Sequence, residues 1–474
     1  MSLKPYSQYK NSKVPFLKEV PVSWDELPFY TLFQEKVIQN NEGKELLSVF
    51  LNLGVIKYNQ SSEKQVHKPS EDISKYQLVE PGDFVLNNQQ AWRGSVGVSK
   101  YTGIVSPAYY VFKLEDAINP SFANYLLRAK LMIDQFVLSS KGVGSIQRNL
   151  FPPFLKRTIV PFPSIDEQLQ IARYLDWKTT QIAKFIKAKK RLIELLKEQK
   201  HVIINNAVTG KIDVRTWKPY PKYNESGVEW LGEIPKHWEG RKLKTFCSLI
   251  SKGTTPSTEG KGFVDCGIRF IKEENISNGR LNLSPEFFID SETDNLLKRS
   301  QLKRNDILIV IAGATIGKVA IMSDDILPAN TNQAVCFLRL FQPVYLKYIY
   351  YILQSQYLKS IINLFSVQSA QPNLAMGVLR NFVLPTPNNE EIADIVLYIE
   401  RNEILIEDSI LKVQSEITLL QEYGKCLIAS SVTGKIDVRH ILVPEYNKED
   451  VIVDLEESSD VEEVVDDTTI DNDL

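Results

Sequence analysis

The octapeptide "VTGKIDVR" occurs twice in this chain, at Val208–Arg215 and at Val432–Arg439. The two copies lie 224 residues apart, and the similarity continues upstream of both at the same offset. Residues 161–215, which begin "PFPSIDEQLQIARYLDWK", align without a gap with residues 385–439, which begin "PTPNNEEIADIVLYIERN". The repeated octapeptide is therefore the end of a much longer repeated segment.

A second match places a leader segment ahead of each copy. The stretch "KPYSQYKNSKVPFLKEVPVSW" (Lys4–Trp24) aligns with "KPYPKYNESGVEWLGEIPKHW" (Lys218–Trp238) at an offset of 214 residues. Because the two offsets differ by ten, the second copy carries about ten extra residues between its leader and its helical segment. A period of this length is too long for a solenoid. The sequence predicts two copies of one domain-plus-helix unit, arranged around a pseudo-two-fold axis as in a dimer.

The two long aligned segments have the apolar spacing of coiled-coil helices. Apolar residues recur at alternating steps of four and three, although each stripe is incomplete. A pseudo-two-fold arrangement predicts that the two helices run antiparallel and pack against each other. The alternative is that each helix packs only on its own domain. The seam positions are Ile171, Leu175, Lys178, Ile182, Ile186, Lys189, Ile193, Leu196, Lys200 and Ile203 in the first copy, and Ile395, Ile399, Asn402, Ile406, Ile410, Val413, Ile417, Leu420, Gly424 and Leu427 in the second.

Both helices have recognisable starts and ends. Ser164 and Asn388 follow proline-containing breaks and precede acidic first turns, which matches N-cap and helix-dipole preferences. Each helix is expected to end near a Thr-Gly pair, because Gly210 and Gly434 can adopt the left-handed conformation that closes a helix. The "KIDVR" that follows each glycine predicts a short extended exit. We interpret the octapeptide as a helix terminator followed by a short strand.

The regions between the leaders and the helices are predicted to be β-rich. They contain apolar runs such as "GDFVLNN" and "NDILIVIAG", with helical patterns at residues 120–136 and 343–365. The expected fold class is α+β, with two β-rich domains separated by two long antiparallel helices that form a coiled-coil spacer. The expected boundaries are 1–158 for the first domain with its leader, 159–216 for the first helix and exit, 217–383 for the second domain with its leader, 384–443 for the second helix and exit, and 444–474 for a tail.

Composition restricts the class of protein. With 474 residues, of which 43% are hydrophobic, the chain can form several packed cores. The longest apolar run, Ile307–Gly317, is about half as long as a membrane-spanning helix, and the start shows no secretory signal. A cytoplasmic protein is therefore expected. Four cysteines and four histidines are scattered without a metal-ligand spacing, so no zinc site is expected.

Charge is distributed unevenly along the chain. Residues 445–474 hold 13 acidic side chains and one lysine, whereas residues 1–444 hold 55 basic and 45 acidic side chains, a net of +10. The body of the chain is therefore basic, as expected of a protein that binds nucleic acid. The acidic tail is expected to be disordered because it repels itself and has no periodic apolar face.

Loops rich in amide, hydroxyl, glycine and basic residues interrupt both β-rich domains. Arginine pairs with guanine and Asn or Gln with adenine in the major groove of DNA, while Lys and Ser contact phosphates. The loops are therefore candidates for DNA reading, and the alternative is that they are merely solvated. They span residues 87–101, 106–110 and 139–149 in the first domain, and residues 251–262, 312–318, 329–333 and 366–373 in the second.

The motifs that suggest enzymes are incomplete. "GATIGKV" (Gly313–Val319) has one residue too few between its glycines for a phosphate loop, and Val319 replaces the required Ser or Thr. "FPPF" (Phe151–Phe154) lacks the Asp or Asn with which amino-methyltransferases hold a flipped adenine. No nucleophile–base pair is evident either. The sequence indicates a reader of DNA without catalytic chemistry.

Several of these segments resemble the specificity (S) subunits of type I restriction-modification systems, over nearly all of residues 1–440. The leader "YNESGVEWLGEIPKHWEGRKLK" (Tyr223–Lys244) is close to the hallmark of the family, and Tyr9–Leu27 is a degenerate copy of it. Residues 82–112 look like the core of a target recognition domain. "DEQLQIARYLD" (Asp166–Asp176) and the two octapeptides resemble the ends of the spacer helices of the family. The tail after Val443 has no counterpart in this pattern.

The resemblance implies a non-catalytic subunit with two target recognition domains, each of which reads one half of a bipartite, asymmetric double-stranded DNA target. The helices would set the gap between the half-sites, as dimer geometry does in other DNA readers. Two modification (methyltransferase) subunits would dock on the scaffold, and restriction subunits would join them. The resemblance implies no cofactor in this chain; S-adenosylmethionine, ATP and Mg²⁺ would belong to the partner subunits.

Candidate site residues fall into three groups. For base reading we expect Asn88, Gln90, Arg93, Tyr109, Gln147 and Arg148 in the first domain, and Thr255, Thr315, Asn330, Asn332, Gln333 and Gln371 in the second. For phosphate contacts we expect Lys100, Lys141, Lys252 and Lys318. For docking of the partner subunits we expect Thr209, Gly210, Lys211, Asp213, Thr433, Gly434, Lys435 and Asp437.

Two other classes of protein remain open. One is a stand-alone DNA adenine methyltransferase or a nuclease, which would need a catalytic motif and would act as the purified chain. The other is a coiled-coil scaffold without sequence preference, which would bind specific and scrambled duplexes equally at fixed salt. Because the two recognition domains diverge in sequence, the DNA-reading hypothesis predicts two half-sites that differ from each other.

Overall fold

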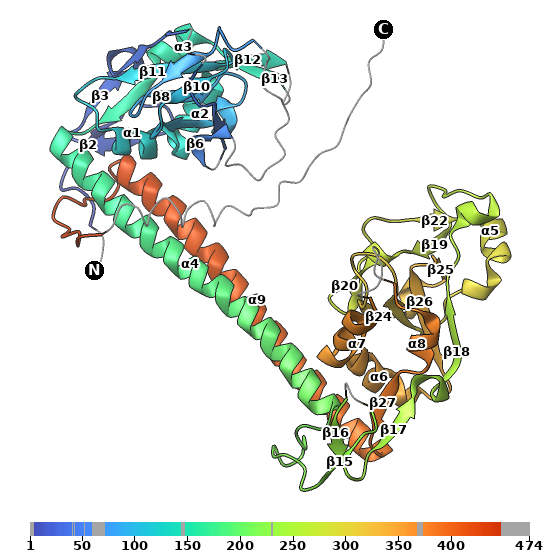
Figure 1. Cartoon of the computed structure of the whole chain (residues 1–474). Coiled ribbons are helices and arrows are strands. Elements are labelled where there is room, and N and C mark those ends of the chain that lie inside the picture. The colour runs from blue at the N-terminus through green and yellow to red at the C-terminus, as the bar shows by residue number, and fades with distance from the viewer. Residues whose placement is uncertain are drawn as a thin grey trace. The chain divides into compact units, whose positions relative to one another are not determined.

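The computed structural model describes residues 4–39, 41, 43–51, 53–58, 72–143, 147–228, 231–366 and 373–446. The chain divides into two compact units, one formed by Met1–Arg191 with Val413–Leu474 and the other by Leu192–Lys412. Each unit combines a β-rich domain with parts of two 44-residue helices, α4 (Ile165–Val208) and α9 (Asn389–Val432), as Figure 1 shows. The α+β prediction is confirmed. The candidate Gln371 and the tail beyond residue 446 lie outside the described residues.

The first unit is built on a four-stranded antiparallel sheet with both faces covered. Side chains alternate between the faces of a strand. Phe84 and Leu86 therefore join the larger core with the helices, while Val85 joins a smaller core with Val111. The near-continuous apolar run of "GDFVLNN" follows from this two-sided burial. The strand order is β4 (Phe33–Glu35), β11 (Tyr109–Leu114), β8 (Phe84–Asn87) and β9 (Val96–Val98).

Short hairpins and helices complete the first unit. The strand pairs are β1 (Tyr9–Asn11) with β2 (Glu19–Pro21), β3 (Asp25–Pro28) with β14 (Ile159–Phe162), β5 (Leu47–Phe50) with β6 (Gly54–Lys57), β7 (Gln77–Val79) with β10 (Gly103–Val105), and β12 (Ser140–Val143) with β13 (Gln147–Leu150). The helices are α1 (Pro120–Leu127), α2 (Lys130–Leu138) and α3 (Pro152–Arg157). The helical pattern at residues 120–136 is thus divided in two, since Ala129 has extended backbone.

The second unit repeats the same central sheet. Its strand order is β18 (Cys247–Lys252), β26 (Val335–Leu340), β23 (Ile307–Val310) and β24 (Val319–Ile321), which places corresponding segments of the two copies in corresponding positions. The ordering of four non-consecutive strands is therefore the same in both units. This agreement confirms the internal repeat at the level of topology.

The second unit also contains elements outside its central sheet. A three-stranded sheet of β22 (Phe288–Ile289), β19 (Ile268–Ile271) and β25 (Ala329–Thr331) includes one parallel pair, β19 with β25. The predicted helix at residues 343–365 is divided at Ser355, whose hydroxyl bonds the carbonyl of Ile352 and competes with the helical pattern. The remaining elements are β15 (Tyr223–Glu225), β16 (Glu233–Pro235), β17 (Glu239–Lys242), β20 (Ile276–Ser277), β21 (Arg280–Leu281), β27 (Val383–Thr386), α5 (Ser291–Leu296), α6 (Leu346–Gln354), α7 (Gln356–Ser366) and α8 (Met376–Arg380).

In each unit α4 and α9 run antiparallel, as predicted. Within the first unit, the Lys189 ammonium forms an ion pair with Glu416, and further toward the start of α4 Ile182 faces Gly424. Within the second unit, Lys200 lies 3.0 Å from the Glu403 carboxylate. Residue numbers rise along one helix as they fall along the other.

Half of the seam predicted from the sequence is buried, and the other half is partly buried. Its buried members are Ile171, Leu175, Ile186, Ile193, Ile395, Ile399, Ile406, Val413, Gly424 and Leu427. The first turns of each helix also pack into the core of the domain that precedes it, so the alternative of packing on the helix's own domain accounts for part of each helix.

The helix ends lie where the sequence predicts them. The helices end at Val208 and Val432, and the glycines two residues later have left-handed backbone, with φ of 70° at Gly210 and 73° at Gly434. The N-cap predicted at Asn388 is present, since its side chain accepts a hydrogen bond from the Glu391 amide at 2.9 Å. The exit is not the predicted strand. A single antiparallel bridge forms at each "KIDVR", because the chain turns back immediately at the following residues.

Candidate nucleic-acid interface and helix-end junctions

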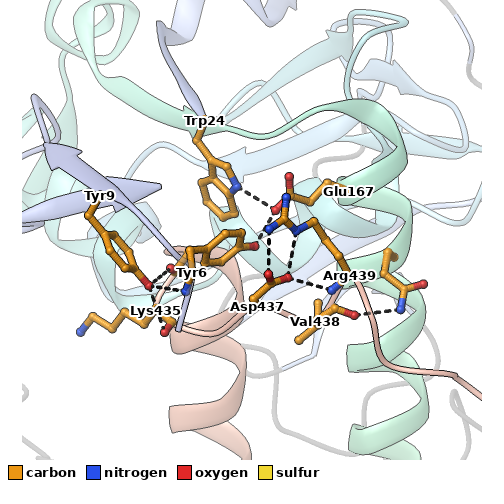
Figure 2. Close-up of polar contacts among 10 residues, drawn as sticks. Tyr6, Tyr9, Trp24, Glu167, Lys435, Asp437, Val438 and Arg439 are labelled. Atoms are coloured by element: carbon orange, nitrogen blue, oxygen red, sulfur yellow. Dashed lines mark hydrogen bonds and ion pairs between the residues drawn. The ribbon is translucent and has the colours of Figure 1, made fainter. Parts of the chain in front are cut away.

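The leader of the first copy meets the end of α9 in a cluster that we call the first junction. It consists of Tyr6, Tyr9, Trp24, Glu167 and the octapeptide Val432–Arg439 (Figure 2). The buried Glu167 carboxylate accepts hydrogen bonds from the Tyr6 hydroxyl and, at 2.9 Å, from the Trp24 indole. The Tyr9 hydroxyl donates to the Gly434 carbonyl at 3.1 Å. The first leader is therefore hydrogen-bonded to the residues that end α9.

The second junction reproduces these contacts with the second leader and the end of α4. Its members are Tyr220, Tyr223, Trp238, Glu391 and the octapeptide Val208–Arg215. Glu391 accepts hydrogen bonds from the Tyr220 hydroxyl and from the Trp238 indole at 3.1 Å, and Tyr223 donates to the Gly210 carbonyl at 3.1 Å. Burial and the neighbouring carboxylate raise the pKa of both Tyr6 and Tyr220 well above the ordinary value of a tyrosine.

One difference separates the two junctions. His237 Nε2 lies 2.9 Å from the buried Glu391 carboxylate, and Ser23 occupies the aligned position in the first leader. Arg215, Lys222 and Lys236 line a surface pocket with His237. The aligned positions for the two lysines in the first leader are the uncharged Gln8 and Val22. The two junctions share their frame but not their surface charge.

The repeated glycines are required by close packing. A Cβ atom on Gly434 would lie 2.4 Å from Pro21 Cδ, and one on Gly210 would lie 2.5 Å from Pro235 Cδ. Contacts this short do not occur between real atoms, so only glycine fits beneath the leader proline. This geometric requirement accounts for the glycine that the two octapeptides share.

Most of the residues predicted to dock partner subunits have contacts within the junctions. Thr209 and Thr433 bond helix carbonyls four residues earlier, and only Lys211 and Lys435 of the eight candidates are exposed. Asp437 receives a two-fold contact from Arg439, which lowers the pKa of the carboxyl. Asp213 is held in the same way by Arg215: burial opposes its ionisation, but hydrogen bonds from Arg215 lower its pKa overall.

Two of the polar loops of the first domain lie together in the structure. The 3-10 turn Ala91–Arg93 contacts β13, and this brings Trp92 and Arg93 beside Arg148. The guanidinium carbons of Arg93 and Arg148 lie 5.8 Å and 5.6 Å from the centroid of the Trp92 ring, within the range of cation–π attraction. The structure thus joins two predicted base readers through a tryptophan that the prediction had not selected.

Lys141 has a fixed position in the same region. Its ammonium lies 3.7 Å from the centroid of the Phe151 ring and 5.0 Å from that of Phe154. The two phenylalanines are the ends of the "FPPF" string. This string therefore supports a cation and does not form an adenine pocket here. The exposed Lys141 remains suited to a phosphate contact.

The other candidates of the first domain have mixed environments. Asn88 accepts a hydrogen bond from the Leu150 amide at 2.9 Å, so its side chain is engaged in the fold. The Tyr109 hydroxyl lies 3.4 Å from Ser48 Oγ, and Gln90 precedes the Ala91–Arg93 turn. Lys100 is exposed. For Gln147 only the backbone in β13 is described.

Three candidates of the second domain have side-chain polar atoms that are engaged or buried within the fold. Asn330 is 0% exposed, and its amide donates to Asp294 at 2.9 Å, so it has no side-chain atom at the surface for a base edge. The amide of Asn332 donates to Glu273 at 2.6 Å. The Thr315 hydroxyl is buried without a hydrogen-bond partner among the described residues. Asn330 is directed toward α5 through Asp294, and Asn332 toward the residues that follow β19 through Glu273. The exposed candidates are Lys252, Lys318 and Gln333, and Thr255 is half-buried.

An aromatic cation site in the second domain was not predicted. The Lys272 ammonium lies 3.3 Å from the centroid of the Phe287 ring and 4.7 Å from that of Phe263. These residues come from separate loops around β19 and β22, and no repeat or motif in the sequence brings them together. Aromatic residues near a basic residue in a polar loop are the only available signal, and it is weak.

Two further features were not found in the part of the chain that the structure describes. Among its residues, no group of three or more His, Cys, Asp or Glu side chains could hold a metal ion. Within the same part of the chain, no helix is long and apolar enough to cross a membrane.

Comparisons with known proteins agree with this geometry. Residues 235–414 match the family model of the type I restriction modification DNA specificity domain. The MjaVIII specificity subunit of a type I restriction enzyme from Methanocaldococcus jannaschii is 24% identical over 372 residues, which cover 77% of this chain and 81% of that protein. The EcoBI specificity subunit of Escherichia coli is 24% identical over 361 residues, covering 76% and 74%. The chain is thus similar to specificity subunits of type I restriction enzymes.

A solved structure supports the fold of this chain. A chain from a structure of a type I R-M system, concerned with complex assembly and conformational transition, matches it with a TM-score of 0.56. That match covers 88% of this chain and 99% of the other chain, at 14% identity. The similarity to specificity subunits supports a non-catalytic role. The matched model lies in the second β-rich domain and in the first part of α9.

Proposed function

We propose that this chain is a specificity subunit, which recognises DNA sequence for a type I restriction-modification complex. Each β-rich domain reads one half of a bipartite, asymmetric target, and the paired helices α4 and α9 set the number of unread base pairs between the halves. The deciding observation is that the two units share a frame but not a reading surface. Glu167 and Glu391 are held by the same tyrosine and tryptophan contacts. The loops that carry Arg93 and Thr315, in contrast, have different polar residues at aligned positions.

The spacer helices supply the docking surface for two modification subunits in this proposal. Apolar side chains that would cost free energy in water remain exposed along α9 and α4. In the second unit Ile404 and Leu405 are 68% and 65% exposed. Further exposed apolar residues on the helices are Phe185, Leu192, Leu195, Val202, Leu397, Leu411, Leu419 and Tyr423. This helix surface suits an apolar partner better than the octapeptides do, since those residues are mostly engaged within the junctions.

The remaining chemistry belongs to partner subunits in this proposal. Modification subunits would bind S-adenosylmethionine and methylate adenine, and restriction subunits would use ATP and Mg²⁺ to translocate and cut DNA. The complex would act in the cytoplasm, where it meets DNA. The specificity subunit itself would require no cofactor. Its contribution is to hold two reading surfaces and two docking surfaces in one chain.

Genome-wide mapping of methylated adenines tests the proposed function. The specificity subunit and its modification subunit are expressed together in a host that lacks other adenine methylation. We expect one motif with two unlike half-sites separated by a fixed gap. Expression of the modification subunit alone is the control and should give no such motif. A palindromic motif with equal half-sites, or methylation without sequence preference, would contradict the proposal.

Docking has a separate test. Replacing Ile404 and Leu405 with lysine should reduce the number of modification subunits that copurify with the specificity subunit, while the fold is retained because both side chains are solvent-exposed. The matched control replaces the exposed Glu422 with lysine on the same helix. Unchanged stoichiometry in the Ile404 and Leu405 variant would exclude this part of the helix as the docking surface.

A further inference from the structure

Trp92, Arg93 and Arg148 form one group on the first recognition domain, which we call the arginine clamp. We propose that Arg93 and Arg148 read guanine bases in the first half-site, and that Trp92 is the positioning residue that holds both guanidinium groups. This inference rests on the proposed function and specifies which base the first domain selects. Arg93 follows Trp92 directly in the chain, whereas Arg148 comes from β13.

The indole of Trp92 has a fixed orientation. Its Nε1 donates to the Gln89 carbonyl at 2.8 Å, which ties the ring to its own turn. The turn is closed by Gly94, whose φ of 106° lets its amide donate to the carbonyl of the buried Ala91. The Gln89 amide in turn donates to the Asn87 side chain at 2.9 Å. Trp92 is therefore a platform whose position depends on the fold and not on a ligand.

The strand that carries Arg148 is fixed as well. The Leu150 amide donates to the Asn88 side chain at 2.9 Å and to the Asn88 carbonyl at 3.1 Å. Arg148 lies two residues earlier in β13 and is paired with Gly142 of β12. The engaged side chain of Asn88 thus has a role within the clamp. It holds β13 against the Ala91–Arg93 turn, so that both arginines reach one ring.

This geometry suits guanine more than phosphate. A guanidinium is planar and has five N–H donors, and guanine presents O6 and N7 side by side in the major groove. Attraction to a ring restrains a long side chain, and this reduces the entropy lost when the fork docks on a base. Phosphate contact needs only a point charge, which Lys141 supplies nearby on the rings of Phe151 and Phe154.

The second recognition domain lacks the clamp. The segment between β23 and β24 is "IAGATIGK", which occupies the place of the segment between β8 and β9 and contains neither arginine nor an aromatic residue. The half-site read by the second domain therefore serves as an internal control. A change in the clamp should alter one half of the target and leave the other half unchanged.

The test compares conservative substitutions in the full chain, assembled with its modification subunit. Arg93→Lys and Arg148→Lys keep the charge but lose the planar fork. Trp92→Phe keeps an aromatic ring, Trp92→Leu removes it, and Lys130→Gln removes one positive charge from an exposed residue on α2 as the matched control. Thermal unfolding of each variant establishes that it is folded. Adenine methylation is then mapped, and binding is measured to a duplex with the recovered motif and to a scrambled duplex.

We expect the first half-site to contain G·C pairs, and each lysine variant to accept other base pairs at a G·C position of that half only. Affinity for the motif duplex should fall by roughly tenfold or more for each arginine variant, since a bidentate contact with guanine is lost. In the Trp92→Leu variant the affinity for the motif duplex should fall by about tenfold, because the arginine side chains are no longer held in place. In the Trp92→Phe variant this affinity should fall by less. Affinity for the scrambled duplex should stay constant, because a base reader loses specific binding only.

Three results would overturn the inference. They are a target with no G·C pair in the altered half, an unchanged motif in both lysine variants, and an equal loss of affinity for the motif and scrambled duplexes, which marks phosphate contacts. Failure of the proposed function is distinguishable from these, because wild-type protein would then yield no two-part motif. In that case the inference fails with it.

Discussion

The hydroxyl of Tyr9 donates to the carbonyl of Gly434 at 3.1 Å, 425 residues away in sequence, and Tyr223 makes the same contact with Gly210. Both bonds lie where a leader meets the end of a spacer helix. Replacing either tyrosine with phenylalanine should destabilise its own unit by about 1 kcal/mol, the net value of a typical hydrogen bond. Urea unfolding measures the loss. No change in either variant would show that water replaces the hydroxyl without cost.

Gly434→Ala should be more damaging than an ordinary substitution at left-handed backbone. Gly227 has nearly the same φ, 71°, but nothing lies within 4 Å of an added Cβ, so Gly227→Ala isolates the backbone strain of about 1–2 kcal/mol. Gly434→Ala adds the clash at 2.4 Å from Pro21 Cδ and should lose clearly more stability in urea unfolding. Equal losses would contradict the packing argument. A folded Gly434 variant that loses one modification subunit would instead assign the octapeptide to docking.

Glu167 provides a test of the buried acceptor at the first junction. Glu167→Ala leaves the Tyr6 hydroxyl and the Trp24 indole without an acceptor, and each unsatisfied buried group costs about 1–3 kcal/mol. Glu167→Gln keeps an acceptor oxygen, so we expect a smaller loss in the same denaturation assay. If the two variants were equally unstable, the negative charge would matter more than hydrogen bonding.

The second domain contains an ion pair whose carboxylate is buried. Asp306 is 0% exposed and accepts from Arg339 Nε at 2.9 Å and from its terminal nitrogen at 2.7 Å. Arg339→Met should destabilise the second unit by about 3–5 kcal/mol, because it leaves an uncompensated buried charge. Adding Asp306→Asn to that variant should recover part of the loss. A double variant no more stable than Arg339→Met would argue against this explanation.

The first junction should lose stability in acid. The pKa of Asp437 is lowered below its ordinary value of 3.8, chiefly by the hydrogen bond from Arg439. A carboxyl with a depressed folded-state pKa stabilises the fold above its unfolded pKa, and this contribution disappears as the pH falls through the folded value. Asp437→Asn should therefore be less stable than wild type at pH 6, and the difference should shrink below about pH 4. A difference that is constant with pH would exclude this linkage.

Much of the frame could be predicted from the sequence because it is repeated. The gapless match ending in "VTGKIDVR" and the apolar seam were sufficient to predict two long helices, their antiparallel pairing and their ends near Gly210 and Gly434. Periodic apolar residues and a glycine that must take positive φ are local signals, and they are present in both copies.

The reading surface was less predictable, because burial depends on contacts between distant segments. Asn330 and Arg93 both belong to polar segments of similar composition. Asn330 is buried and donates a hydrogen bond to Asp294, whereas Arg93 lies beside Trp92 at the surface. Nothing local distinguishes them. The predicted strand after each glycine was wrong for a related reason. A segment of five residues becomes a strand only if a partner strand runs beside it, and here the chain turns away.

The bridge between Lys4 and Asp437 is the counterpart of the bridge between Asp213 and Lys218. In each pair the lysine carbonyl accepts the aspartate amide at 2.8 Å. In one pair the two residues are close neighbours along the chain, and in the other they are far apart in sequence. The second leader therefore stays beside its octapeptide through a short connection even when the bond opens, whereas the first leader has no such tether. The first junction thus depends on its own contacts, and the second on chain connectivity as well.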